Sequence, residues 1–360
     1  MATLNLSQYA GGWGIGVNMD ALHLSDMFGA TIQIASSTHL QLTSLGARPG
    51  VFDFYGVGFT YDGADQITGG QLQSLTVYEN IPGAPFKFGV TGLSTPIAQF
   101  AGWIPTDATQ TAFGVMFAGD DTIYGSDGGG GGAPGDLIRS YGGNDSIMAG
   151  AGPDTVVGGS GDDSISGSLG DDVILGGNGQ KNYLRGDDGD DRITGGSGFD
   201  DINGNKGNDT IDGGPGGGDW LVGGQGNDLI TAHASQNILY GNLGNDTLNA
   251  GSGGDLMRGG QGDDVLVGGS GNDWLSGDRG NDTITGGAGA DTFHTFSGAG
   301  IDRVLDFHIA EGDKVQVDAG TIYTVIQQGA DTVIDMGGGD QMILVGVDKA
   351  TLTPGWIFTV

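Results

Sequence analysis

The chain has 360 residues, of which 78 are glycine and none is cysteine, and its 44 acidic and 12 basic side chains give a formal net charge of -32. This charge argues against nucleic acid and anionic membranes as partners, because both require a cationic contact surface, and it favours cations. Without cysteine there is neither a disulfide framework nor a thiolate metal site. The sequence has no run of about 18 apolar residues, so no membrane span is predicted.

Residues 1–117 predict an antiparallel β domain that serves assembly or ligand binding. Short alternating runs are separated by glycine, proline and asparagine, which are typical turn residues. The runs are Ala30–Ala35, Val51–Tyr61, Leu72–Tyr78 and Phe86–Val90, with Ile97–Trp103 as a further strand or a short helix. The first residues have no basic segment followed by an apolar one, so no cleavable secretory signal is expected there.

Residues 118–294 contain a repeat of nine residues with the pattern G-G-x-G-x-D-x-U-x, where U is apolar. The aspartates of this pattern are Asp136, Asp145, Asp154, Asp163, Asp172, Asp191, Asp200, Asp209, Asp219, Asp228, Asp246, Asp255, Asp264, Asp273, Asp282 and Asp291, with Asp121 in an earlier unit before a glycine-rich spacer. Asn182 and Asn237 occupy the same position in two units, and the steps 172→182 and 209→219 are ten residues long.

This spacing predicts a right-handed parallel β-roll that binds several Ca²⁺ ions. Each unit supplies a turn and a short strand, and two units complete one coil, so units i and i+2 stack at strand spacing. The U side chains point inward, while the glycines allow the positive φ angles that the turns need. Carbonyl and carboxylate oxygens are the ligands that Ca²⁺ prefers. Because one apolar residue in nine makes a thin core, we expect folding to depend on calcium.

The repeats, seen plainly in GGSGDDSIS and GGQGDDVLV, resemble the RTX family of calcium-binding proteins that Gram-negative type I systems secrete. The resemblance implies an extracellular or cell-surface location, and export through the type I secretion machinery before folding in external calcium. The segment GAGADTFHTFSGAGIDRVLDFHIAEGDKVQV is similar to the end of such rolls and implies Asp302 and Asp306 as further calcium ligands. Residues 295–360 are then a β-rich cap with a secretion signal that ends in IFTV.

The sequence contains no recognisable catalytic motif. The five histidines, His23, His39, His233, His294 and His308, form no H-E-x-x-H zinc motif, and no G-x-S-x-G turn is present. Without cysteine there is no thiol nucleophile. The chain is therefore predicted not to be an enzyme.

The even-numbered units, counted from Asp136, differ from the odd ones. Both asparagine units, both ten-residue units and the glycine-free turn TAHASQN are even. Four aromatic residues that flank U and should point outward are also all in even units: Tyr183, Trp220, Tyr240 and Trp274. An exposed stripe of this kind marks a contact surface. It predicts packing against another subunit or another domain, the chain's own N-terminal domain included.

Two functions remain open. The first is a structural protein that assembles in calcium as a surface layer, matrix, filament or adhesin, through self-association or contact with a cell-surface polysaccharide. The second is a binding module or effector whose N-terminal β domain recognises a glycan or host ligand. An enzyme with an unrecognised site is the weakest alternative.

Overall fold

The computed structural model describes residues 31–36, 39–43, 50–61, 67–81, 84–96, 120, 122–124, 135, 137–233 and 235–360, with only the backbone described before residue 120. The chain forms two compact units, residues 1–173 and 174–360. All regular structure described is β except one short 3-10 helix, Lys349–Thr351, so the predicted all-β class is confirmed.

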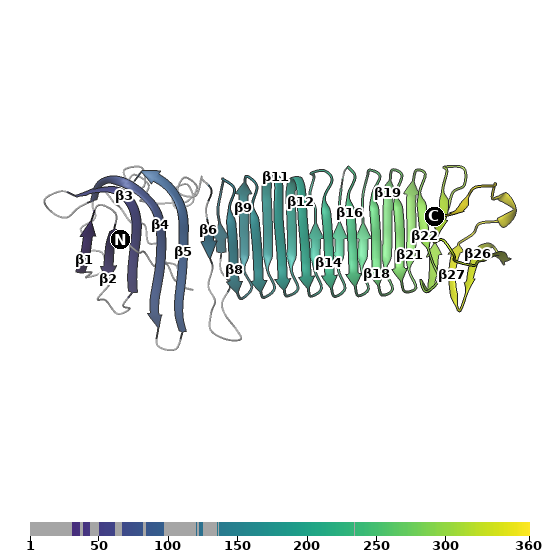
Figure 1. Ribbon diagram of the computed structural model, residues 1–360, viewed down its shortest axis with the longest axis horizontal. Coiled ribbons are helices and arrows are strands. Elements are labelled where there is room, and N and C mark those ends of the chain that lie inside the picture. Colours follow the sequence, from purple (N-terminus) through teal and green to yellow (C-terminus); the bar gives the residue numbers. More distant parts are fainter. Residues whose placement is uncertain are drawn as a thin grey trace. The chain divides into compact units, whose positions relative to one another are not determined.

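The first unit begins with an antiparallel meander of five strands (Figure 1). They are β1 (Thr31–Ser36), β2 (His39–Thr43), β3 (Gly50–Tyr61), β4 (Ile67–Ile81) and β5 (Ala84–Pro96). The register aligns apolar residues across the sheet, with Leu40 opposite Phe54, Phe54 opposite Leu75 and Leu75 opposite Val90. The antiparallel prediction is confirmed, although β2 was not predicted. The predicted element Ile97–Trp103 lies outside the described residues.

The parallel part of the first unit starts at the earliest repeat. Its strands are β6 (Thr122–Tyr124), β7 (Leu137–Arg139), β8 (Ser146–Ala151), β9 (Thr155–Ser160) and β10 (Ser164–Leu169). Strand β5 pairs with β6 antiparallel, after which every pairing is parallel and skips one strand: β6 with β8, β8 with β10, and β7 with β9. This is the i and i+2 stacking that the repeat length predicts.

The second unit continues this pattern in two parallel stacks. Its strands are β11 (Val173–Asp188), β12 (Arg192–Lys206), β13 (Thr210–Asp212), β14 (Trp220–Gln225), β15 (Leu229–Thr231), β16 (Ile238–Leu243), β17 (Thr247–Asn249), β18 (Leu256–Gln261), β19 (Val265–Ser270), β20 (Trp274–Arg279), β21 (Thr283–Ala288) and β22 (Thr292–Thr295). Even units form the stack β14, β16, β18, β20 and β22, and odd units form β13, β15, β17, β19 and β21. The long strand β12 pairs with both β13 and β14.

The U side chains of both stacks are buried and form the apolar core of the roll. From Ile123 to Phe293, every one that is described is at most 6% exposed. Their neighbours along each strand alternate outward, which is the period of two that a pleated strand imposes. The thin core predicted from the repeat is therefore confirmed.

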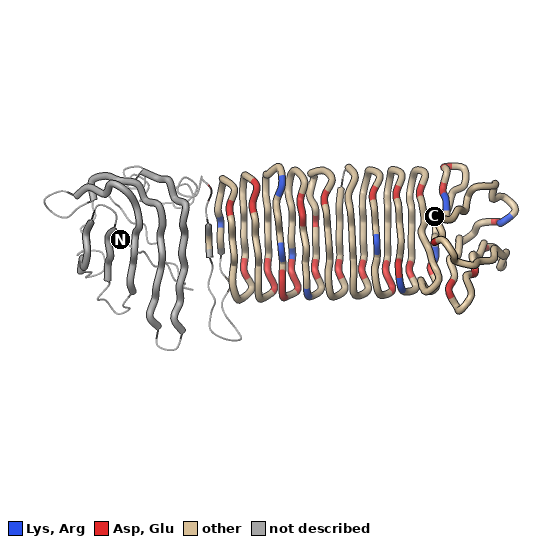
Figure 2. The backbone as a smooth tube through the Cα atoms, viewed as in Figure 1, with Lys and Arg blue, Asp and Glu red and all other residues tan. Residues whose placement is uncertain are grey.

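The turns take positive φ angles at the second and fourth positions of the repeat, where glycine is the most frequent residue, although Asn205, Asn242 and Asp278 are among the residues that adopt such an angle at the second position. Gly262, at a fourth position, has φ +130°, and a Cβ atom there would lie 2.0 Å from the carbonyl oxygen of Gly244 one coil earlier. Side chains are thus excluded both by φ and by the close approach of successive coils. Figure 2 shows that acidic residues of the second unit gather at the turns, at both ends of the strands.

The C-terminal residues close both stacks. Strands β23 (Ile301–Val304) and β27 (Asp340–Leu344) extend the odd stack, and β24 (Lys314–Val317) and β28 (Ile357–Thr359) extend the even one. Between them, β25 (Thr324–Gln328) and β26 (Asp331–Gly337) form an antiparallel sheet with β27. The predicted β-rich cap is confirmed. Within the described part of the chain, no helix has the length and apolar character needed to cross a bilayer.

Candidate metal centre

The aspartates of the repeat stack into two columns, one along each edge of the roll. We call the turns before odd units the odd edge and those before even units the even edge. In each column the backbone N–H of one aspartate donates to Oδ1 of its counterpart one coil later, 18 or 19 residues on. In the odd column, Asp209 donates to Asp228 at 2.8 Å, Asp228 to Asp246 at 2.8 Å and Asp246 to Asp264 at 2.7 Å.

The second carboxylate oxygen of these residues is buried without a hydrogen-bond donor. Among the described residues this holds for Oδ2 of Asp200, Asp209, Asp219, Asp228, Asp246, Asp255, Asp264, Asp273, Asp282, Asp291 and Asp302. Each of these side chains is at most 2% exposed. The Oδ2 atoms lie against turn glycines: a Cβ at Gly195 would be 2.4 Å from Oδ2 of Asp200. A buried, unpaired oxygen on an ionised group is costly unless a cation neutralises it.

Burial raises the pKa of these carboxyl groups far above the ordinary value. The pKa of Asp264 rises from 3.8 to about 8, because desolvation outweighs the hydrogen bond from the Asp246 backbone and repulsion from Asp282 and Asp246 adds to the rise. Burial likewise raises the pKa of Asp209 and Asp228 to about 7. Without a cation, the columns therefore resist ionisation near neutral pH.

The residues present fit calcium. A calcium ion takes about six to eight oxygen ligands in a flexible geometry. The columns offer unpaired carboxylate oxygens, and the glycine turns beside them offer backbone carbonyls. No three side chains of His, Cys, Asp or Glu converge on one point in the described part of the chain, so carbonyl oxygens have to complete any coordination shell. When bound, the ion supplies the positive charge that makes a buried ionised column stable.

A family model identifies these repeats. The model describes the RTX calcium-binding nonapeptide repeat in four copies, and it matches residues 148–180, 185–217, 216–248, 240–275, 249–284 and 267–304. The chain carries RTX calcium-binding nonapeptide repeats. RTX nonapeptide repeats bind Ca²⁺, and the two columns of buried aspartates are consistent with multiple sites.

Solved structures similar to this RTX chain include two bacterial proteins. The chain is 27% identical to a subunit of the mannuronan C5-epimerase of Azotobacter vinelandii, over 35% of this chain and 78% of that one, with a TM-score of 0.24. It is 21% identical to the extracellular lipase LipA of Serratia marcescens, over 58% of this chain and 40% of that one, with a TM-score of 0.28. At these TM-scores neither structure bears on the function of the chain. No curated protein matches it.

Most of the predicted calcium ligands lie in the two columns. Asp145 to Asp291 are all buried there, at 0–2% exposed, whereas Asp121 and Asp136 lie outside the described residues. Asp302 continues the odd column, because its Oδ1 accepts the N–H of Asp282 at 3.4 Å. The individual ligand assignments stay predictions.

The end of the RTX roll differs from the sequence prediction at two aspartates. Asp306 stands outside both columns: its oxygens accept the N–H groups of Gly286 at 2.9 Å and Gly287 at 2.8 Å. Asp313 was not predicted, yet it continues the even column by accepting the N–H of Asp291 at 3.0 Å. Its signal was the G-D-x-V pattern at residues 312–315, with a buried valine two residues after the aspartate.

The four predicted interface aromatics do not all stand free on the even stack. Tyr183 is 42% exposed and Trp220 is 45% exposed. Trp274 stacks on His294 with ring centroids 5.0 Å apart, and its Nε1 donates to Gln316. Tyr240 is half-buried beside a surface hollow. Tyr183 and Trp220 are therefore exposed as predicted, whereas Trp274 is partly covered by the C-terminal segment.

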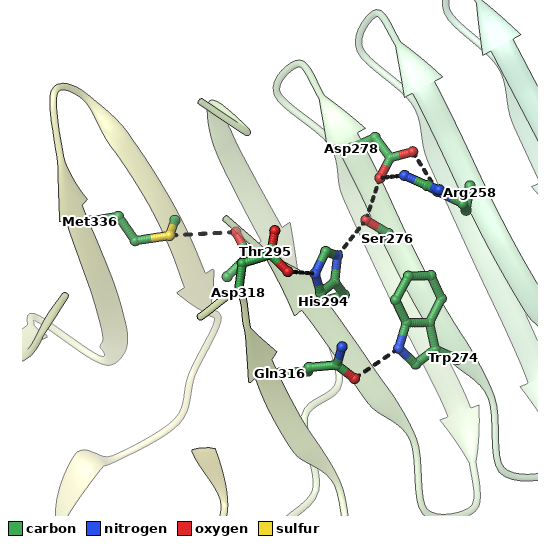
Figure 3. Close-up of polar contacts among 9 residues, drawn as sticks. All are labelled: Arg258, Trp274, Ser276, Asp278, His294, Thr295, Gln316, Asp318 and Met336. Carbon is green, nitrogen blue, oxygen red and sulfur yellow. Dashed lines mark hydrogen bonds and ion pairs between the residues drawn. The ribbon is translucent and has the colours of Figure 1, made fainter. Parts of the chain in front are cut away.

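A serine, a histidine and an aspartate of the chain line up next to Trp274 (Figure 3). Ser276 Oγ donates to Asp278 at 2.7 Å, so its oxygen accepts from Nδ1 of His294 at 3.1 Å. Nε2 of His294 faces Asp318 at 3.0 Å. The serine proton already has an acceptor, and the side chain is fully buried. The chain of contacts, which begins at Arg258 and Asp278, holds the C-terminal cap on β20.

Proposed function

We propose that this RTX chain is a secreted structural protein that folds on meeting external calcium and assembles at the cell surface or in the extracellular matrix. The observation that carries the proposal is the pair of buried carboxylate columns with unpaired oxygens, which couples folding to the cation. A surface layer, a filament and an adhesin all fit this description. The proposal includes no catalytic activity.

An apolar file on the outer face of the even stack supports assembly. Trp220, Ile238, Leu256 and Trp274 lie opposite one another in register on β14, β16, β18 and β20. Trp220 is 45% exposed and Ile238 is 37% exposed. The file bears no charge, which matters in a chain of net charge -32, because two copies can approach there with the least repulsion. We therefore take a second copy of the chain as the partner.

Sedimentation velocity in calcium tests this assembly with a matched pair of variants. Trp220→Ser removes the most exposed member of the file, and Leu229→Ser removes a side chain of 42% exposure from the same strand position on the odd stack. We expect Trp220→Ser to reduce the assembled fraction and Leu229→Ser to leave it unchanged, with calcium-induced folding intact in both. Equal assembly by both variants would contradict the proposed surface.

Export by a type I system is the second part of the proposal. RTX proteins are substrates of such systems. A chain that folds only in external calcium can cross the exporter unfolded, because the cytosol holds little free calcium. We expect the protein in the medium of cells with an intact type I exporter and inside cells in which the exporter is disabled. Secretion that persists without the exporter would refute this part.

A second candidate function is polysaccharide binding, favoured by a hollow on the second unit. The hollow has a volume of about 660 Å³ and is open above Gly260, where Asn242 and Asp278 flank a position without a side chain. Tyr240 and Phe296 add aromatic rings, and Gln261 an amide. Rings suit the C–H faces of sugars, and amides suit their hydroxyl groups. Binding to immobilised neutral and acidic polysaccharides that Tyr240→Ala abolishes would favour this function, and binding to none of them would reject it.

A further inference from the structure

The two aspartate columns are not equivalent, and Asn237 shows the difference at atomic detail. This side chain is 1% exposed and takes the place of an aspartate in the even column. Its Oδ1 accepts the N–H of Asp219 at 3.0 Å, and its own N–H donates to Oδ1 of Asp255 at 2.6 Å. The backbone ladder is therefore continuous through the asparagine, and only the second side-chain atom has changed.

That second atom has partners where the aspartates have none. Nδ2 of Asn237 donates to the backbone carbonyl of Ser235 and to Oδ1 of Asp255, both at 3.1 Å. Oδ2 of Asp219 and of Asp255, on either side, has no donor among the described residues. The amide protons thus bind a turn carbonyl and a carboxylate oxygen, the two kinds of atom that a calcium ion would bind at this place.

The turns around both asparagines also disfavour a cation. The turn before Asn237 contains no glycine and carries His233, whose Nε2 lies 2.8 Å from Oδ1 of Asp212. The residue before Asn182 is Lys181, whose ammonium group lies over the ring of Tyr183. In the sequence, the other even turns from residue 140 to residue 291 contain no lysine, arginine or histidine. The two basic side chains therefore coincide with the two missing carboxylates.

A second ladder of short polar side chains strengthens the contrast between the edges. On the odd edge from Asp191 to Asp264, the residue before each column aspartate accepts the N–H of its counterpart one coil later, at 2.7–2.9 Å. This ladder comprises Asp190, Asn208, Asn227, Asn245, Asp263 and Asn281. The corresponding even positions from 181 to 254 are Lys181, Phe199, Gly218, Gln236 and Gly254, which contain no Asp or Asn. Over this range the odd ladder is continuous, whereas the even edge carries the same kind of hydrogen bond at Asn144–Asp162 and Asn272–Ala290 and has no Asp or Asn at the ladder positions from 181 to 254.

We propose that Asn182 and Asn237 mark places in the even column where no calcium ion binds, so that the even edge holds fewer ions than the odd edge. At Asn237 the side-chain amide takes the place of the ion: its hydrogen bonds to Asp219 and Asp255 link three successive coils without metal. Calcium binds more weakly when fewer carboxylates surround it. A site beside an asparagine has one carboxylate fewer than a site between two aspartates. The inference rests on calcium binding by the repeats and is independent of the proposed assembly.

Counting bound ions in matched variants tests the inference. Asn237→Asp restores a carboxylate to the even column, and Asn245→Asp makes the same change of charge on the exposed odd ladder. Each protein is dialysed against a calcium buffer and its ions are counted by native mass spectrometry and atomic emission. We expect Asn237→Asp to bind at least one more ion than the natural chain, and Asn245→Asp to bind the same number. An unchanged count for Asn237→Asp, or an equal gain in both variants, would overturn the inference.

A third variant keeps the test decisive if Asn237→Asp does not fold. Asp264→Asn places an amide in the odd column, between Asp246 and Asp282. Circular dichroism first confirms that the variant folds in calcium. We expect it to bind at least one ion fewer than the natural chain, and an unchanged count would show that a column carboxylate is not needed to hold an ion. The ion count does not depend on self-association, so its failure would leave the assembly proposal standing.

Discussion

Removing calcium should make the roll stable in mild acid and unstable in mild base. The rise of the Asp264 pKa from 3.8 to about 8 corresponds to about 6 kcal/mol for ionising this group in the folded chain, at about 1.4 kcal/mol per pH unit. For Asp228, whose pKa rises to about 7, the cost is about 4 kcal/mol. The two costs share neighbour repulsion and are not additive. Even so, a few such groups offset the stability of roughly 5–15 kcal/mol that is typical of a folded domain.

The direction of the pH effect follows from the sign of these shifts. The folded-state pKa values lie above the unfolded-state value near 3.8, so the folded chain binds more protons. Protonated columns therefore stabilise the calcium-free roll fully below about pH 4, and this stability is lost as the pH rises through about 6 to 8. This is the reverse of ordinary acid denaturation.

Far-UV circular dichroism of chain stripped of metal on a chelating resin measures this transition. We expect β structure at pH 5, its loss at pH 8, and its return at pH 8 when calcium is added, with light scattering to exclude aggregation. Asp264→Asn should move the calcium-free transition to higher pH, because it removes one carboxyl group and keeps an Oδ1 acceptor. A calcium-free chain that is equally folded at pH 8 and pH 5, or unfolded at both, would refute the reasoning.

Three further predictions concern single positions. Gly262→Ala should destabilise the calcium-bound roll by more than about 3 kcal/mol in thermal unfolding, because its Cβ would clash with the Gly244 carbonyl. Gly320→Ala is the control: Gly320 has φ +89° but nothing within 4 Å of its Cβ, so the change should cost about 1 kcal/mol. Leu248→Ala should cost about 2–5 kcal/mol in calcium, because the side chain is fully buried, and a cost below about 1 kcal/mol would contradict a packed core. Asp306→Asn should lower stability by about 1–3 kcal/mol, because the amide oxygen can replace only one of the two carboxylate acceptors. The number of bound calcium ions should not change. The loss of an ion would identify Asp306 as a calcium ligand.

The repeat length alone determined most of the roll. A turn and a strand every nine residues allow only i and i+2 stacking, which places each U residue inside and each marker aspartate at a turn. The buried U residues and both columns follow from that spacing. The differences of the even edge follow from it too, because Asn182, Asn237 and the glycine-free turn are visible as breaks in the pattern. Local composition was enough for the five-strand meander except for β2, a short run without a glycine or proline boundary on its N-terminal side.

Tertiary structure alone decided which atoms and which irregular segments meet. The steps from Asp282 to Asp302 and from Asp291 to Asp313 span 20 and 22 residues, so spacing could not show that Asp313 joins a column while Asp306 binds backbone amides outside it. The covering of Trp274 by His294 and Gln316 likewise depends on how the cap folds back. A periodic sequence specifies its own stacking, because equivalent residues of successive coils pair with one another. Where the period ends, packing between distant residues takes over, and it was this packing that partly covered Trp274.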